Sequence, residues 1–140
     1  MSHTDRQPVL VVDAANVVGS VPDGWWRDRL GATIRLRDRL ASLAHNGIAG
    51  VAAPVRVILV TEGKARGVAS VADVEVVEAP GSGDDAIVAL VADILGHTAR
   101  STGQSSDATR SVILVTADRE LRSRVTDLGA EIVGPSAIPR

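Results

Sequence analysis

Short runs of apolar, mostly β-branched residues alternate along the chain with longer segments of helical periodicity. We expect strands at residues 9–12, 55–61, 74–79, 111–118 and 131–134. A continuous apolar run such as Val9 to Val12 is typical of a strand that is covered on both faces of a parallel sheet. Helical spacing of apolar residues predicts helices over about 31–46, 84–99 and 118–128. This alternation predicts an α/β domain with a mainly parallel sheet.

The length of 140 residues predicts one domain that spans the whole chain, residues 1–140, and no internal repeat is present. The segment 100–110 is polar, rich in Gly, Ser and Thr, and without period, so we expect an exposed loop there. The two ends, residues 1–7 and 136–140, are expected to be frayed.

Composition removes several classes of chemistry. The chain has no cysteine, which excludes disulfides, thiol catalysis and cysteine-bound zinc. His3, His45 and His97 are far apart in sequence, which argues against a zinc site or a Ser–His mechanism. The chain shows no apolar run of about 20 residues and no apolar segment near its start, so we expect a cytoplasmic protein without a membrane partner.

A net charge of −2 argues against a protein that is held to nucleic acid by bulk charge, but not against a local basic rim. Residues 27–39 form one such basic segment. In it, five arginines outnumber two aspartates: Arg27, Arg29, Arg35, Arg37 and Arg39 against Asp28 and Asp38. A solvated helix face is the simpler explanation of this run, and contact with phosphate is the functional one.

Three acidic residues follow predicted strands or begin predicted helices at the same edge of the sheet. Asp13 ends the first strand, Asp84 follows the glycine-rich loop at 80–83, and Asp118 follows the strand that begins at 111. Ligands of parallel α/β sheets bind outside the carboxyl ends of the strands. We therefore expect these three carboxylates to lie near one another.

Helix geometry points two of these acids inward. Asp84 lies on the line of the apolar stripe that follows it, and Asp118 lies on the line of Leu121, Val125 and Leu128. Asp85 lies well off the first stripe. Carboxylates that converge repel one another and lose solvation, and a divalent cation such as Mg²⁺ or Mn²⁺ relieves both costs. The simpler alternatives are a helix cap for Asp84 and Asp118 and a turn residue for Asp13.

Three motifs resemble those of PIN-like nucleases of the NYN type. The segment VVDAANVVG resembles their first-strand motif, with Asp13 and Asn16 in the matching places, and GDDAIVAL resembles their central acid followed by a helix. The segment VTADRELR resembles their Ser/Thr-x-Asp motif through Thr116 and Asp118. The order and spacing agree over nearly the whole chain. Ala14 departs from the glycine of many relatives, and a further late acid of many PIN domains has no clear counterpart here.

This resemblance implies a three-layer, Rossmann-like PIN fold and metal-dependent hydrolysis of RNA by Mg²⁺ or Mn²⁺. Asp13, Asp84 and Asp118 would be the catalytic, metal-binding acids, and Asn16 and Thr116 would orient them through hydrogen bonds. Further candidate ligands are Asp85 and Glu62, the latter at the end of the second strand, where an exposed turn residue is the alternative. The expected partner is single-stranded or structured RNA.

The only aromatic residues, Trp25 and Trp26, follow the first strand and so lie near this edge of the sheet. We expect Trp25, with Arg27 and Arg29, to contact substrate, because indole rings stack on bases and arginines bind phosphate. The alternative is that one tryptophan covers the core and the other covers a loop or a dimer contact. Ser82 is a further candidate for substrate binding, because the loop at 80–83 could hold phosphate on its backbone N–H groups.

Other functions stay open at this point. The same acids suit a metal-dependent hydrolase of nucleoside phosphates, and a non-catalytic RNA-binding or interaction module is a third class. An antitoxin-like protein partner and a homodimer are further expectations. Neither ATP nor dinucleotide binding is supported, because the loop at 80–83 lacks the required lysine and glycine spacing.

Overall fold

Five parallel strands form one sheet in the computed structural model, which describes residues 7–21, 24–48, 50–63, 67–102 and 111–138. The strand order is β3-β2-β1-β4-β5. The strands are β1 (Val9–Asp13), β2 (Arg56–Thr61), β3 (Val74–Glu78), β4 (Val112–Val115) and β5 (Glu131–Val133). The α-helices are α1 (Ala14–Gly19), α2 (Arg29–Ala44), α3 (Gly83–Thr102) and α4 (Arg119–Thr126), with 3₁₀ turns η2 (Trp25–Arg27) and η5 (Pro135–Ala137).

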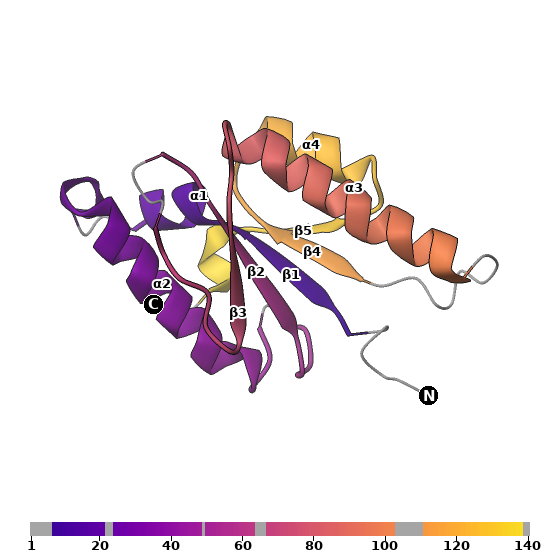
Figure 1. Ribbon diagram of the computed structural model, residues 1–140, viewed down its shortest axis with the longest axis horizontal. Coiled ribbons are helices and arrows are strands. Elements are labelled where there is room, and N and C mark those ends of the chain that lie inside the picture. Colours follow the sequence, from indigo (N-terminus) through magenta and orange to yellow (C-terminus); the bar gives the residue numbers. More distant parts are fainter. Residues whose placement is uncertain (1–6, 22–23, 49, 64–66, 103–110, 139–140) are drawn as a thin grey trace.

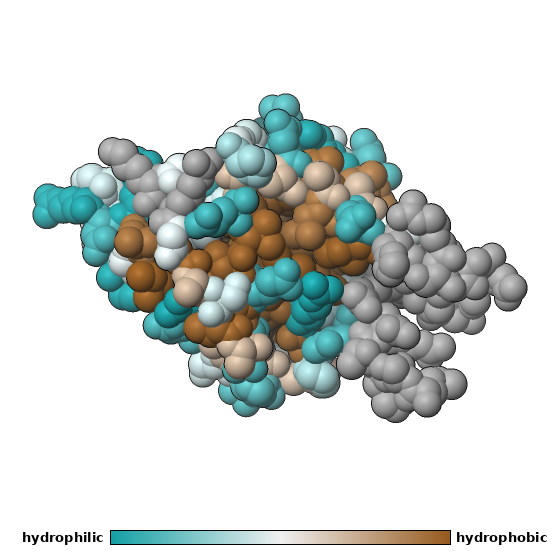
Figure 2. Space-filling model, viewed as in Figure 1, coloured by the Kyte–Doolittle hydropathy of each residue, from teal (hydrophilic) through white to brown (hydrophobic). Residues whose placement is uncertain are grey.

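Helices cover both faces of the sheet, α1 and α2 on one side and α3 and α4 on the other (Figure 1). Successive side chains of a strand point to opposite faces, so β1 feeds two cores. Leu10 and Val12 pack in the core under α1 and α2, and Val9 and Val11 in the core under α3 and α4. Figure 2 shows apolar side chains gathered between the helical layers and polar ones on the outer helix surfaces. The expected three-layer α/β fold is confirmed.

The register of the strands brings the candidate residues together. Val12 pairs with Val115 of β4, so Asp13 and Thr116 are the next positions along these two neighbouring strands. Asp13 itself pairs with Val60 of β2, two residues before Glu62. Side chains alternate along a strand, and Asp13 therefore points to the same face as Val11, the face covered by α3 and α4.

The structure departs from the sequence prediction in several helices. The short α1 directly after β1 is not anticipated, because six residues give too little periodicity to recognise. Helix α3 runs through Thr102, so residues 100–102 are helical and not loop, and 103–110 lie outside the described residues. None of the helices in the described part of the chain has the length and apolarity that a membrane crossing needs.

The carboxyl-terminal tail also differs from the expectation of a frayed end. Residues 135–137 form η5, and Ile138 is buried in the core under α1 and α2. Burial of the Ile138 side chain stabilises this end of the chain. Residues 1–6, 139 and 140 lie outside the described part of the chain.

The predicted stripe of α4 holds for Leu121 and Val125, which are fully buried, but not for Leu128, which is 40% exposed. The helix ends at Thr126, so Leu128 no longer follows its periodicity.

We expect Leu121→Ala to lower the free energy of unfolding by about 2–5 kcal/mol. Leu128→Ala is the matched control and should change it by less than about 0.5 kcal/mol. Urea denaturation measures both, and equal losses would contradict the observed end of α4.

Candidate functional site

Asp13 is a nearly buried carboxylate at the end of β1, with 6% of its surface exposed. Its Oδ1 accepts a long hydrogen bond of 3.4 Å from the backbone N–H of Asn16, which makes it the N-cap of α1. Its Oδ2 accepts a hydrogen bond of 3.0 Å from the hydroxyl of Thr116. The β1–β4 register places these two side chains next to each other, although 103 positions separate them in sequence.

Thr116 and Asn16 tie the loops after β1 and β4 together. The hydroxyl oxygen of Thr116 accepts the backbone N–H of Asp118 at 3.1 Å while its hydrogen goes to Asp13. The side-chain Oδ1 of Asn16 accepts the backbone N–H of Ala117 at 2.8 Å. Thr116 therefore contacts a candidate acid directly. Asn16 acts differently from the expectation, because its side chain fixes the backbone between Thr116 and Asp118 and not a carboxylate.

Asp118 is the N-cap of α4. Its Oδ1 accepts the backbone N–H of Leu121 at 3.0 Å, as the simpler explanation of this acid expects. In the described part of the chain, its Oδ2 accepts no hydrogen bond. The side chain is partly exposed, and one of its two oxygens caps the helix.

Asp84 is not a cap. Helix α3 begins at Gly83, and the hydroxyl of Ser82 caps it by accepting the backbone N–H of Asp85 at 3.2 Å. Asp84 is partly buried, and within the described residues its carboxylate forms neither a hydrogen bond nor an ion pair. The capping explanation therefore fails for this acid. Ser82, the candidate for substrate binding, is thus the cap of α3 through its hydroxyl oxygen.

Asp85 lies apart from the other acids. Its exposed carboxylate accepts a hydrogen bond of 3.1 Å from Nη2 of Arg124, so the pair joins the first turn of α3 to α4. Ion pairs of this exposure contribute little stability. The predicted direction of Asp85, off the apolar stripe of α3, agrees with this placement.

Glu62 follows β2 and reaches across to α3. Its Oε2 accepts the backbone N–H of Gly83, and the side chain is partly buried. A Cβ atom at Gly83 would stand 3.0 Å from the carboxyl carbon of Glu62, which accounts for glycine at the first position of this helix. Glu62 is therefore built into the strand-end site and is not simply an exposed turn residue.

The charges of these acids act on one another. Burial, and less strongly the charges of Asp84 and Glu62, raises the pKa of Asp13 from 3.8 to about 6, although hydrogen bonds from Thr116 and Asn16 oppose the shift. Burial, with the charges of Asp118 and Glu62, also raises the pKa of Asp84. In the part of the chain that the structure describes, no three Asp, Glu, His or Cys side chains stand close enough to enclose a metal ion.

A cavity of about 360 Å³ adjoins the acids on the α1 and α2 side of the sheet. Its lining residues are Ala15, Val18, Trp25, Arg29, Thr33, Glu62, Gly63 and Gly81. Glu62 belongs both to this cavity and to the group of interacting acids. The volume lies within the range of small-molecule pockets, about 300–1,000 Å³.

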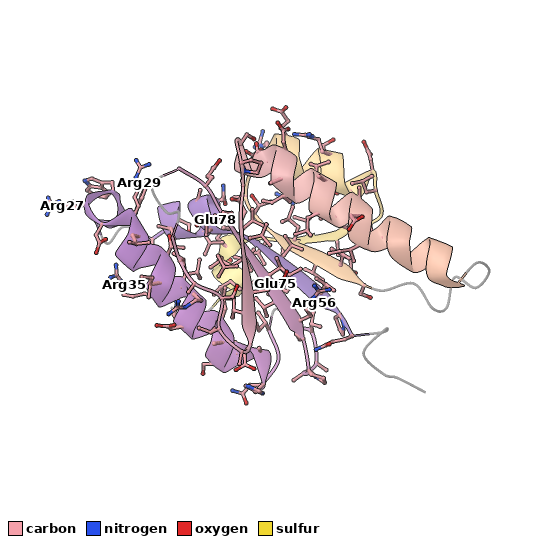
Figure 3. The ribbon with its side chains drawn as sticks, in the orientation of Figure 1. Arg27, Arg29, Arg35, Arg56, Glu75 and Glu78 are labelled. Carbon is pink, nitrogen blue, oxygen red and sulfur yellow. The ribbon has the colours of Figure 1, made fainter. Side chains whose placement is uncertain are left out.

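Trp25 and Arg29 form one wall of this cavity. The guanidinium carbon of Arg29 lies 5.2 Å from the centre of the Trp25 ring, a cation–π contact. Trp26 is 56% exposed, and Arg27 lies 6.0 Å from the centre of its ring. Figure 3 shows Arg27 and Arg29 at the amino end of α2, with Arg35 further along that helix.

A break in the backbone before α2 keeps Arg29 out of the core. The backbone breaks at Asp28, which has φ −151° and caps α2 by accepting the backbone N–H of Gly31. Arg29 begins the helix and is exposed. Thr33 is not anticipated as a lining residue, because no charge or motif marks it.

No family model matches this sequence, and no curated protein sequence matches it. The fold itself is one that solved structures share, an α/β domain with a five-stranded parallel sheet. It is similar to Rae1 (YacP) from Bacillus subtilis, in crystal structures of that protein and of a variant with a single substitution. Both superpose with a TM-score of 0.68, at 17% and 19% sequence identity respectively, over 94% of this chain and 71% and 72% of theirs.

The raised pKa of Asp13 has a consequence for stability. The Asp13 carboxyl group holds its proton more tightly in the folded protein than in the unfolded chain. Its contribution to the free energy of unfolding is therefore fully present below about pH 4 and is lost as pH rises through about 6. The difference corresponds to about 3 kcal/mol. We expect Asp13→Asn to gain stability relative to the unchanged protein between about pH 4 and pH 7, measured by urea denaturation in EDTA.

The exposed acid Asp93 of α3 supplies the control for this measurement. Asp93→Asn removes an exposed carboxylate and is measured over the same pH range. If the stability difference for Asp13→Asn changes with pH no more than that for Asp93→Asn, the carboxylate of Asp13 does not carry a raised pKa.

Proposed function

We propose that this protein is a metal-dependent nuclease that hydrolyses RNA phosphodiester bonds, with Mg²⁺ or Mn²⁺ bound by Asp13, Asp84 and Asp118. The main observation behind this proposal is the buried carboxylate of Asp13. Thr116 donates a hydrogen bond to it, and the negative charges of Asp84 and Glu62 act on it. No described Lys, Arg or His forms an ion pair with it. An uncompensated buried carboxylate is costly, and a bound cation offsets that cost.

The donor set fits a hard divalent cation. Mg²⁺ prefers oxygen ligands, keeps several waters, and is often held by only one or two carboxylates. Asp13, Asp84 and Asp118 offer only carboxylate oxygens, which suit this ion better than zinc, whose sites in proteins are built mainly from Cys and His. The metal, when bound, would supply an activated water and would stabilise the charge that develops on the phosphate.

The protein's own residues have distinct tasks in this proposal. Thr116 orients Asp13 through its hydroxyl, and Asn16 fixes the backbone that leads to Asp118. Asp84 keeps both carboxylate oxygens free of hydrogen bonds within the described residues, so it is available as a ligand. Glu62 adds negative charge beside Asp13 and Asp84, and Asp85, paired with Arg124, contributes least.

The wall of Trp25 and Arg29 supports single-stranded RNA as the substrate. An aromatic ring and a guanidinium group both stack on a base, and this kind of binding is tolerant of sequence. The exposed Trp26 with Arg27 continues the same surface outward. The choice of RNA over DNA rests on the resemblance of the three motifs to NYN-type nucleases.

We expect purified protein to cleave labelled single-stranded RNA with Mn²⁺ or Mg²⁺ and not in EDTA. Loss of a partner that only orients a metal ligand costs about 10- to 100-fold in activity, which is the effect expected for Thr116→Val. Asp13→Asn and Asp84→Asn should each lose at least about 100-fold. Cleavage is followed by gel electrophoresis of the RNA.

The control variant is Asp93→Asn, which removes a carboxylate from the exposed face of the same helix as Asp84. It should retain full activity. Cleavage that survives Asp13→Asn would place the chemistry elsewhere. Turnover of mononucleotides without cleavage of RNA would instead favour a nucleoside-phosphate hydrolase.

Gly81 is a position where a side chain can be added at the cavity beside Glu62. A Cβ atom at Gly81 would meet no heavy atom within 4 Å, so Gly81→Leu places a side chain at the cavity. We expect this variant to raise KM about tenfold with little change in kcat, because it removes binding that substrate and transition state share. Gly96→Leu is the matched control, since Gly96 is equally open and lies on α3, outside the lining of this cavity. An unchanged KM for Gly81→Leu would exclude this cavity from substrate binding.

A further inference from the structure

A second cavity, of about 410 Å³, lies along the face of α1 opposite to Trp25. Its lining residues are Val17, Ser20, Val21, Arg39, Ala117, Pro135, Ser136 and Ile138. Val17 and Ser20 line this cavity, whereas Ala15 and Val18 line the one beside Trp25, so α1 separates the two. The described residues that form its wall include one cation, Arg39, and no carboxylate.

Arg39 is a partly buried cation that has no partner among the described residues. Its Nε atom is buried and donates no hydrogen bond, and its guanidinium forms no ion pair with any described residue. Arg37, on the same helix, shows the usual behaviour, since it binds the carboxylate of Asp38 and the backbone oxygen of Ala69. Arginine is seldom buried unpaired, because loss of hydration must be offset by an anion or by acceptors.

The surroundings of Arg39 suit an anion with several oxygens. Val17, Pro135 and Ile138 make part of the wall apolar, and a low dielectric constant strengthens attraction between opposite charges. The guanidinium group presents a planar set of donors that matches a phosphate. The hydroxyl of Ser136 stands on the same wall and can donate to a phosphate oxygen.

The position of the cavity relates it to the acids. Ala117 lines it, and the same residue lies between Thr116 and Asp118, with its N–H held by Asn16. An anion beside Arg39 is therefore separated from the acids only by the short segment that follows β4.

We propose that Arg39 and this cavity bind a phosphate group of the RNA strand, next to the phosphate that the acids cleave. This assignment rests on the proposed nuclease function for its ligand, although an anion site at Arg39 would stand without it. The proposal assigns a function to Arg39, a partly buried cation that takes no part in the acidic site.

The test compares Arg39→Met with Arg35→Met. Methionine keeps most of the length of arginine without its charge, and Arg35 is an exposed arginine one turn earlier on α2. Binding of a fluorescent single-stranded RNA is measured in EDTA as a function of salt concentration. Arg39→Met should bind about tenfold more weakly, as the loss of a charged hydrogen bond predicts. The slope of log K against log salt concentration should fall by about 0.7, the value for one phosphate on a single strand.

The control should keep both the affinity, within about twofold, and the slope. If Arg39→Met keeps them as well, the proposal is overturned. If Arg39→Met does not fold, Arg39→Lys replaces it, because lysine keeps the charge but loses the planar set of donors. Weaker binding by Arg39→Lys at an unchanged salt slope supports the site, and unchanged binding overturns it.

Inorganic phosphate separates this proposal from the nuclease function. Sodium phosphate, compared with sodium chloride of equal ionic strength, should raise the melting temperature of the unchanged protein and of Arg35→Met more than that of Arg39→Met, whose rise is limited to the general stabilisation by phosphate. Absence of RNA cleavage together with this result would remove the nuclease function and leave the anion site. Cleavage together with equal responses of all three proteins would leave the nuclease function and remove the anion site.

Discussion

The site depends on one hydrogen bond, from the hydroxyl of Thr116 to the carboxylate of Asp13. Thr116 also accepts the N–H of Asp118, so a single hydroxyl joins the end of β1, the end of β4 and the start of α4. This hydrogen bond requires the parallel register of β1 and β4. In that register Val12 pairs with Val115, and Asp13 and Thr116 are the next residues of the two segments. The sheet holds an acid in a place where burial raises its pKa, and the hydroxyl keeps it in one orientation.

Much of this arrangement could be read from the sequence, because buried strands and helix stripes leave strong patterns. The continuous apolar run of β1 predicts a covered parallel strand, and the periodicity of α3 and α4 places Asp84 and Asp118 at the strand ends. The pattern does not distinguish a metal ligand from a helix cap, since an acid at the start of a helix can serve as either. The hydrogen bonds identify the caps, which are Ser82 for α3 and Asp118 for α4.

Other features leave little trace in a single sequence. Helix α1 is too short for a period, and the exposure of Leu128 depends on where α4 stops. Arg39 carries a weak signal, because it lies three residues after Leu36 and so borders the apolar stripe of α2. Among the described residues Arg39 has no partner, because those that surround it come from α1 and from the segments after β4 and β5 and offer no carboxylate. Only the folded chain brings these segments together.

The contact between Glu62 and Gly83 has a consequence for how this fold varies over evolution. The carboxylate of Glu62 occupies the space that a side chain at Gly83 would need, and its oxygen satisfies the N–H of that glycine. A larger residue at 83 would push the glutamate away from the acids, and loss of the glutamate would leave that N–H without its partner. The two positions should therefore change together, so that aligned relatives carry either this pair or neither member of it. Covariation of a strand-end acid with the first residue of the next helix would mark, from sequences alone, which relatives keep the acid in this place.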